Sequence, residues 1–220
     1  MTASDDYHRL ELSIASNPND PRRIMPSITA EHTRILDVGC GAGQILIASD
    51  LGSGVLAVGT DIDHSALVLG SQLSDNKVRF VCASGEALTF ASKTFDLVIC
   101  RVALPYMHIP RALTEMSRVL KDGGDLWLVL HPFEMVRKEL FESLAGLRLK
   151  SILDRLYVVT NGLALHLLGR QFKVPIGGGR YESFQTNTGI KRVLRSAGFE
   201  DIKIRREKFF VVTAKKASTT

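Results

Sequence analysis

The stretch that decides the fold is Arg34 to Gln44, RILDVGCGAGQ. An apolar run carries one embedded acid, Asp37, and then breaks into glycines at alternate positions, Gly39, Gly41 and Gly43. Such a pattern is typical of a buried strand that ends in a tight turn. We therefore expect a strand over the apolar part and a tight loop over the glycines.

The segment that follows, residues 44–51, is mostly apolar, contains alanine and lacks proline. This composition predicts a helix that begins within the glycines and points its N-terminus back at the loop. A helix N-terminus leaves backbone N–H groups unpaired, and glycines let a ligand approach them closely. The loop is therefore a candidate ligand cradle.

Apolar strands and helix-length segments alternate through most of the chain. Strands are expected over residues 35–38, 55–60, 78–82, 95–100, 126–130, 201–205 and 208–214. Helices are expected over residues 44–51, 64–73, 112–120 and 188–197, the last ended by Gly198. Strands of continuous Val, Ile and Leu favour a parallel sheet covered on both faces. The predicted fold is α/β: a doubly wound, mostly parallel, Rossmann-like sheet of seven strands, the last antiparallel, with helices on both faces.

The alternation stops between residues 133 and 180. Residues 134–148 are amphipathic at helical period, and residues 151–168 are apolar nearly all round. The second segment predicts a helix buried between the core and another element, with Leu153, Leu156, Leu163 and Leu167 packed inside a lid. The alternatives are that the apolar helices face an apolar or mixed substrate or form a dimer interface. We expect a single domain over residues 1–220, with residues 133–180 as a helical lid inserted in it.

Composition indicates an ordinary globular chain. Its 220 residues are 23% charged and 45% hydrophobic, with a net charge of +5. Residues 190–220 hold nine Lys or Arg against three Asp or Glu, so the excess of positive charge lies at the C-terminal end. A basic end can face nucleic acid or an anionic membrane, but a solvated strand face is the commoner explanation.

The three cysteines, Cys40, Cys82 and Cys100, show neither CxxC spacing nor histidines at metal-ligand intervals. A disulfide framework and a metal site are therefore not indicated, and a reducing cytoplasm fits best. The first residues carry early acids and no apolar core, unlike a secretory signal. The least charged long run, 156–169, falls short of the ~20 apolar residues that span a bilayer. We expect a cytoplasmic protein with no membrane partner.

The spacing of the glycines narrows the choice of ligand. They follow GxGxG, with Gln44 where the dinucleotide fingerprint GxGxxG needs its third glycine, and no GxxxxGK[ST] is present. Asp61, in TDID at the end of the second strand, lies 18 positions after Gly43. An acid about 20 residues beyond the glycines can accept hydrogen bonds from both ribose hydroxyls. The alternative role, capping the helix at His64, suits Asp63 better.

At this point a family resemblance is apparent. ILDVGCGAG followed by VGTDID, FDLVIC and SRVLKDGGDLWLV resembles the class I S-adenosylmethionine-dependent methyltransferases of the small-molecule, type 11 kind. The resemblance covers residues 34–131 densely, and the ending VLRSAGFEDIKI resembles the C-terminal helix and strand of the family. It implies S-adenosylmethionine as cofactor and S-adenosylhomocysteine as product.

The resemblance implies a place for the cofactor. The loop, with Gly39, Cys40, Gly41 and Gly43, would lie against its methionine and ribose parts. Asp37 would hold the loop backbone or the amino end of the cofactor. The remaining cofactor contacts implied are Asp61 on the ribose, Ile62 on the adenine, Ser84, Gly85 and Glu86 around the adenine amino group, and Arg101 at the sulfonium end. Ser84 stands where the family most often has an acid.

Methyl transfer needs little chemistry from the protein, because the sulfonium is already activated. Alignment in a dry pocket can supply up to ~7–11 kcal/mol of the barrier, and an acceptor of high pKa would add a general base. The candidates on the rim are Tyr106 and His108 beyond the fourth strand and His131 directly after the fifth. The alternatives are a structural hydrogen-bond role for His131 and plain packing for Tyr106 and His108.

The predicted function is transfer of a methyl group from S-adenosylmethionine to a small organic acceptor by in-line substitution. One alternative is a nucleic-acid methyltransferase or binding module that uses the basic C-terminal end, although RVALPY after the fourth strand lacks the [ND]PP[YFW] motif of base amino methylation. A nicotinamide oxidoreductase is disfavoured by GxGxG. A family member that binds the cofactor without catalysis is also compatible with the sequence.

Overall fold

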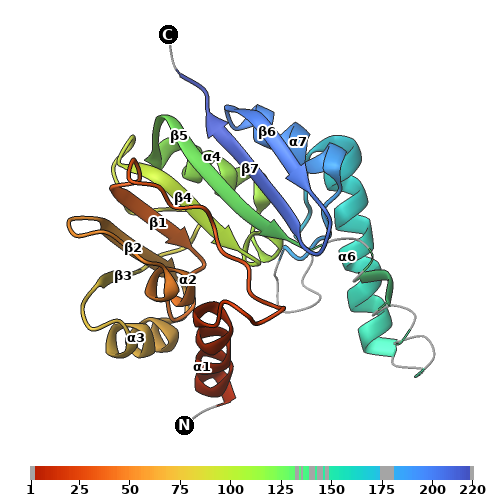
Figure 1. Ribbon diagram of the computed structural model, residues 1–220. Helices are drawn as coiled ribbons and strands as arrows, with labels where there is room; N and C mark the ends of the chain where they lie inside the picture. The colour runs from red at the N-terminus through yellow and green to blue at the C-terminus, as the bar shows by residue number, and fades with distance from the viewer. Residues whose placement is uncertain are drawn as a thin grey trace.

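The structure is a computed structural model that describes residues 3–131, 149–173 and 181–218, together with residues 134, 136–138, 142 and 146. Seven strands form one sheet in the order β3-β2-β1-β4-β5-β7-β6 (Figure 1). The strands are β1 Arg34–Val38, β2 Leu56–Asp61, β3 Val78–Cys82, β4 Phe95–Arg101, β5 Leu120–Leu130, β6 Phe199–Arg205 and β7 Phe210–Lys216. Strands β1 to β5 pair in parallel, and β7 runs antiparallel to both β5 and β6. The predicted doubly wound sheet and its antiparallel last strand are confirmed.

Helices lie on both faces of this sheet (Figure 1). They are α1 Ala3–Ser16, α2 Gln44–Ala48, α3 His64–Leu73, α4 Ile109–Val119, α6 Leu149–Leu168 and α7 Asn187–Ser196, with a 3₁₀ turn at Leu104–Tyr106. Helices α4 and α7 belong to the larger apolar cluster on one face, and α2 belongs to the cluster on the other. Both faces are thus covered, as continuous apolar strands require.

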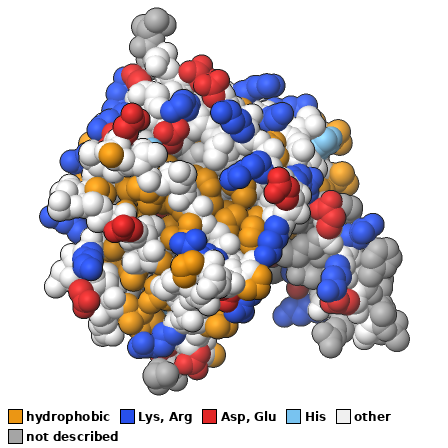
Figure 2. All heavy atoms as spheres, viewed as in Figure 1, with side chains coloured by type: hydrophobic (Ala, Val, Ile, Leu, Met, Phe, Trp, Pro, Cys, Tyr) orange, Lys and Arg blue, Asp and Glu red, His pale blue; other side chains and the backbone are white. Residues whose placement is uncertain are grey.

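On the α2 side, the segment 17–33 crosses the sheet between α1 and β1 (Figure 1). Its apolar residues Ile24, Met25 and Ile28 pack against the buried cluster that contains Trp127 and Val129. Apolar side chains gather towards the centre of this face, and charged side chains lie mainly around its rim (Figure 2). The polar N-terminal part of the chain therefore contributes a strap over the sheet as well as α1.

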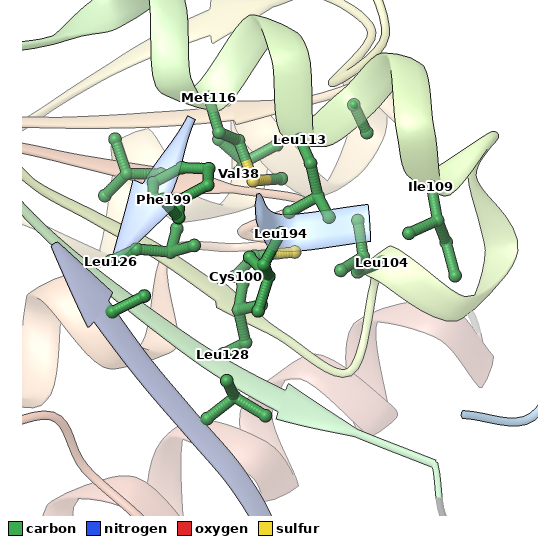
Figure 3. Close-up of a cluster of buried hydrophobic side chains, with 14 of the residues drawn as sticks. Val38, Cys100, Leu104, Ile109, Leu113, Met116, Leu126, Leu128, Leu194 and Phe199 are labelled. Carbon is green, nitrogen blue, oxygen red and sulfur yellow. The ribbon is translucent and has the colours of Figure 1, made fainter. Parts of the chain in front are cut away.

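The larger core joins β4 and β5 to α4 and α7. Leu113 and Met116 of α4 and Leu194 of α7 gather around Cys100 of β4 and other buried side chains (Figure 3). All of these are fully buried. Close packing of this kind makes the volume of each side chain matter for stability, and it fixes β4, whose carboxyl end reaches the cavity described below.

Two sequence expectations differ from the structure. Helix α2 ends at Ala48 rather than at residue 51, because the chain extends at Ser49. Helix α6 is not buried all round: it buries Val158, Asn161, Gly162 and Leu165. The four leucines expected inside the lid are exposed, Leu153 by 57%, Leu156 by 48%, Leu163 by 49% and Leu167 by 65%. Among the described residues, only one face of α6 packs on the domain, and the four leucines lie outside that face.

The expected helix over 134–148 lies mostly outside the described residues. Among the described helices, none is both long enough and apolar enough to cross a bilayer.

Truncating one core side chain tests the packing. We expect Leu113→Ala to lower the free energy of unfolding by about 2–5 kcal/mol, because it removes buried atoms and leaves a cavity. The matched control, Leu168→Ala, changes a leucine that is 63% exposed and should cost less than 1 kcal/mol. Urea unfolding followed by circular dichroism measures both, and equal losses would contradict the packing described.

Candidate functional site

The glycine loop turns tightly after β1 and carries three left-handed residues. Gly39 has φ +72° and Gly41 has φ +56°, a region that side chains with a Cβ rarely adopt. A Cβ on Gly39 would lie 2.2 Å from Cβ of Ala103, and one on Gly41 would lie 2.9 Å from Cε1 of His8. Glycine is therefore required here by both conformation and space, which fits a cradle that a ligand approaches closely.

Asp61 holds this loop in place. Its Oδ2 accepts a hydrogen bond from the backbone N–H of Gly41 at 2.8 Å, and its Oδ1 accepts one from the N–H of Asp63 at 3.0 Å. Asp63 in turn caps α3, as expected, by accepting from the N–H groups of Ser65 and Ala66. Asp61 orients the loop together with Thr60, whose backbone carbonyl accepts from the N–H groups of Gly39 at 2.8 Å and Cys40 at 3.1 Å.

Asp37 lies buried beneath the loop at the end of β1. It is 2% exposed, and its Oδ1 has no hydrogen-bond partner among the described residues. Burial raises the pKa of Asp37 to about 7; Arg101 opposes this shift and the charge of Asp61 adds to it. The expected hydrogen bond from the loop backbone to Asp37 is not formed by this Oδ1. An unpaired buried acceptor is costly, so the site presents a carboxylate that a cationic group can satisfy.

Helix α1 closes the other side of the loop. Glu11 receives a hydrogen bond from Nη2 of Arg101 at 2.6 Å, and the ring of His8 lies 2.8 Å from the side-chain nitrogen of Gln44. The Glu11–Arg101 pair joins residues 90 positions apart and is about four-fifths buried on both sides. None of these contacts was identified from the sequence. The one available signal is that Tyr7 and Glu11, four residues apart, share a helix face.

These elements enclose a cavity of about 400 Å³ at the carboxyl ends of β1, β2 and β4. Its size lies in the range of about 300–1,000 Å³ that small-molecule sites occupy. Of the site residues expected from sequence, it is lined by Asp37, Gly39, Cys40, Gly41, Asp61, Arg101 and Tyr106. The other lining residues are Tyr7, His8 and Glu11 of α1, Gln44 and Ile45 of α2, and Val102 and Ala103 after β4.

The other expected residues lie outside the lining of this cavity. A Cβ on Gly43 would meet the ring of Phe80 at 2.7 Å, so this glycine faces β3. Ile62 is 75% exposed. The segment expected at the adenine is held by its own contacts: Ser84 Oγ accepts from the N–H of Glu86 at 3.2 Å, and a Cβ on Gly85 would lie 2.8 Å from Val38 Cγ1.

The three residues expected at the rim lie in two places: His131 and Tyr106 contact each other, and His108 lies at the start of α4. His131 follows β5, and its ring meets that of Tyr106 edge to face at 5.5 Å between centroids, which places it against a residue of the cavity lining. His108 is instead the N-cap of α4, where its Nδ1 accepts from the N–H of Arg111 at 3.3 Å. Its ring packs against Tyr181 at 4.8 Å. Within the described residues, no three His, Cys, Asp or Glu side chains gather as a metal site would require.

Comparison with known proteins agrees with this geometry. A family model for the methyltransferase domain matches residues 36–128. The uncharacterized methyltransferase YcgJ of Bacillus subtilis is 33% identical over 125 residues, which are 54% of this chain and 49% of that protein. The chain thus matches about half the length of this curated relative.

Solved structures extend the likeness of the fold over the whole chain. A methyltransferase of Thermotoga maritima, described as a possible histamine N-methyltransferase, superposes with a TM-score of 0.57 at 16% identity and covers 98% of this chain and 91% of its own. Human N-acetylserotonin methyltransferase, solved in complex with S-adenosylmethionine, superposes with a TM-score of 0.59 at 16% identity. The match covers 98% of this chain and 56% of the human one.

The match of a methyltransferase-domain model to residues 36–128 and the class I S-adenosylmethionine-dependent methyltransferase fold confirm the resemblance read from the sequence. S-adenosylmethionine is the cofactor that this family implies.

The buried Asp37 predicts a pH dependence of stability. Between pH 3.8, the ordinary pKa, and about 7, the folded chain keeps a proton on Asp37 that the unfolded chain has lost. Stability therefore falls as pH rises through this window, by on the order of 4 kcal/mol in total. Asp37→Asn cannot titrate, so we expect its stability to rise relative to that of the wild type as pH increases from about 4 to about 7 and to level off above that. Urea unfolding at several pH values measures the difference, and a difference independent of pH would contradict the assignment.

Proposed function

We propose that this chain transfers the methyl group of S-adenosylmethionine to a small organic acceptor. The observation that carries the proposal is the joining of the glycine loop to Asp61 at the floor of a cavity of about 400 Å³. The match to the methyltransferase domain spans both of these features. When bound, the cofactor supplies a methyl group on a sulfonium that is already activated for displacement.

Charge in the cavity supports this cofactor. The lining carries three carboxylates, Asp37, Asp61 and Glu11, against one guanidinium, that of Arg101. S-adenosylmethionine has two cationic groups, the sulfonium and the ammonium, against one carboxylate, so its net charge is opposite to that of the lining. Asp37, with its unsatisfied Oδ1, is the group that we assign to the amino end, while Asp61 accepts from the ribose hydroxyls.

The acceptor would enter beside Tyr106 and His131. Alignment of the acceptor with the methyl group, together with exclusion of water, would supply most of the rate. Tyr7 of α1, Val102 and Ala103 add apolar surface on this side of the cavity, which suits an acceptor with an apolar part. If the acceptor is a hydroxyl, the imidazole of His131 is the general base that we assign, since its ring lies against that of Tyr106, which lines the cavity.

The basic C-terminal end gives weaker support to a nucleic-acid substrate. Several of its cations are already paired within the chain: Lys215 with Asp125 at 2.9 Å, and Lys216 with Asp122 at 3.4 Å. Acidic side chains lie among the basic ones on the face shown in Figure 2. A nucleic-acid partner would give an affinity that falls steeply with salt.

The second alternative, cofactor binding without transfer, is tested by assaying methyl transfer to a panel of small acceptors.

Substitution of Asp61 tests the cofactor site. We expect Asp61→Asn to weaken binding of S-adenosylhomocysteine by about 10- to 100-fold, because a charge-assisted hydrogen bond becomes a neutral one. Asp63→Asn, two residues away and outside the cavity lining, is the matched control and should bind like the wild type. Isothermal titration calorimetry measures all three. Equal affinity in the wild type and Asp61→Asn, or no binding in the wild type, would overturn the proposal.

The role of Asp37 predicts that ligand affinity rises with pH, whereas the stability of the free protein falls with pH. A cationic amino group binds the ionised form of Asp37, whose pKa lies at about 7 before the ligand binds. We expect the affinity for S-adenosylhomocysteine to rise by up to about tenfold per pH unit below pH 7 and to level off above it. Asp37→Asn should bind more weakly and show no such slope between about pH 5.5 and pH 7. A slope that persists in Asp37→Asn would assign it to another group.

A further inference from the structure

Helix α6 exposes a continuous apolar stripe. The stripe consists of Leu149, Leu153, Leu156, Thr160, Leu163 and Leu167. Its leucines are exposed by 48–75%. Successive members are separated by four, three, four, three and four residues, which places them along one side of a helix at the spacing that pairs one helix with another.

The opposite side of α6 is fixed on the domain, so the stripe cannot turn inward. Asn161 is 1% exposed, and its side chain donates to the carbonyls of Phe172 and Glu182 and accepts from the N–H of Phe172 at 2.8 Å. Gly162 packs so closely on Phe184 that a Cβ would lie 2.3 Å from its ring. Helix α6 stands at the margin of the molecule beside α7 (Figure 1). A partner can therefore reach the stripe without any rearrangement of the helix.

The stripe is complementary to itself when two copies run antiparallel. A two-fold axis at the level of residue 158 would bring Leu149 against Leu167 of the second copy and Leu153 against Leu163. The remaining layer would pair Leu156 with Thr160. Every member of the stripe thus meets another member, which is the self-complementarity that an isologous interface requires. Antiparallel helices also oppose their dipoles favourably.

The charges around the stripe favour a second copy of this chain over a membrane surface as its partner. No member of the stripe is charged, and between residues 151 and 168 the charged side chains are Asp154 and Arg155, of which Arg155 pairs with Glu182 at 3.2 Å. A helix that lies on a membrane has instead a polar face rich in Lys and Arg. A parallel pair would bring Lys150 of the two copies to the same level, whereas the antiparallel pair places Lys150 level with His166 of the second copy and so keeps the two lysines apart.

We propose that this stripe is the interface of a homodimer in which two α6 helices pack antiparallel. Helix α6 has 20 residues and is therefore about 30 Å long, so the seam is short and the interface small. Because each helix is already folded on its own domain, little ordering opposes association. The dimer is consequently a reversible one that forms as concentration rises.

Sedimentation velocity over micromolar to several hundred micromolar protein tests the interface. We expect the wild type to shift from monomer to dimer, and Leu153→Glu and Leu163→Glu each to raise the dimer dissociation constant by at least about tenfold, because each places a charge in an apolar layer. Leu168→Glu, an exposed leucine of the same helix outside the stripe, is the control and should dimerise like the wild type. Circular dichroism checks that each variant is folded. A wild type that stays monomeric throughout would overturn the proposal.

A double variant tests the antiparallel register. Leu153→Glu combined with Leu163→Lys places glutamate against lysine twice in the antiparallel dimer, but like charges against each other in a parallel one. We expect the double variant to dimerise more tightly than either single variant. A double variant that associates no better than the single ones would overturn the antiparallel arrangement. A monomeric wild type that sediments with anionic lipid vesicles, and loses this in Leu153→Glu, would assign the stripe to a membrane instead.

Discussion

The hydrogen bond from the backbone N–H of Gly41 to Asp61 is the contact on which the site depends. It joins the loop after β1 to the end of β2 over 2.8 Å, and it does so where neighbouring parallel strands end at the same edge of the sheet. The left-handed glycines then bring the loop close to Ala103 on one side and to α1 on the other. A side chain on Gly39 or Gly41 would separate these elements, so the cavity exists only because the loop is built from glycine.

Much of the fold and the floor of the site could be predicted because their signals are local. Continuous apolar strands, the alternating glycines and Asp61 at its distance from them are all visible within short windows of sequence. The cap at Asp63 follows from residue type and position alone. These features are encoded residue by residue, and the structure places them as expected.

The rest depends on contacts between distant segments. Nothing near Glu11 in the sequence indicates that it meets Arg101, 90 residues away, and burial of His8 against the loop follows only once α1 lies over it. For α6, the sequence indicates an apolar helix but does not distinguish leucines that are buried from leucines that are exposed to solvent. The difference comes from Asn161 and Gly162, whose close contacts select the face that packs on the domain. Expectations at His108 also depended on context, since its ring nitrogen caps α4.

Asp37 links the energetics of the fold to the proposed function. A buried carboxyl with an unpaired oxygen lowers stability near neutral pH, and a bound cationic group would offset this cost. The most direct test is a crystal structure with S-adenosylhomocysteine. Our account predicts ribose hydroxyls within hydrogen-bonding distance of the Asp61 carboxylate and the amino end of the ligand at Asp37. Crystals grown at saturating ligand that leave this cavity without ligand density, or that hold the adenosyl group elsewhere, would contradict it.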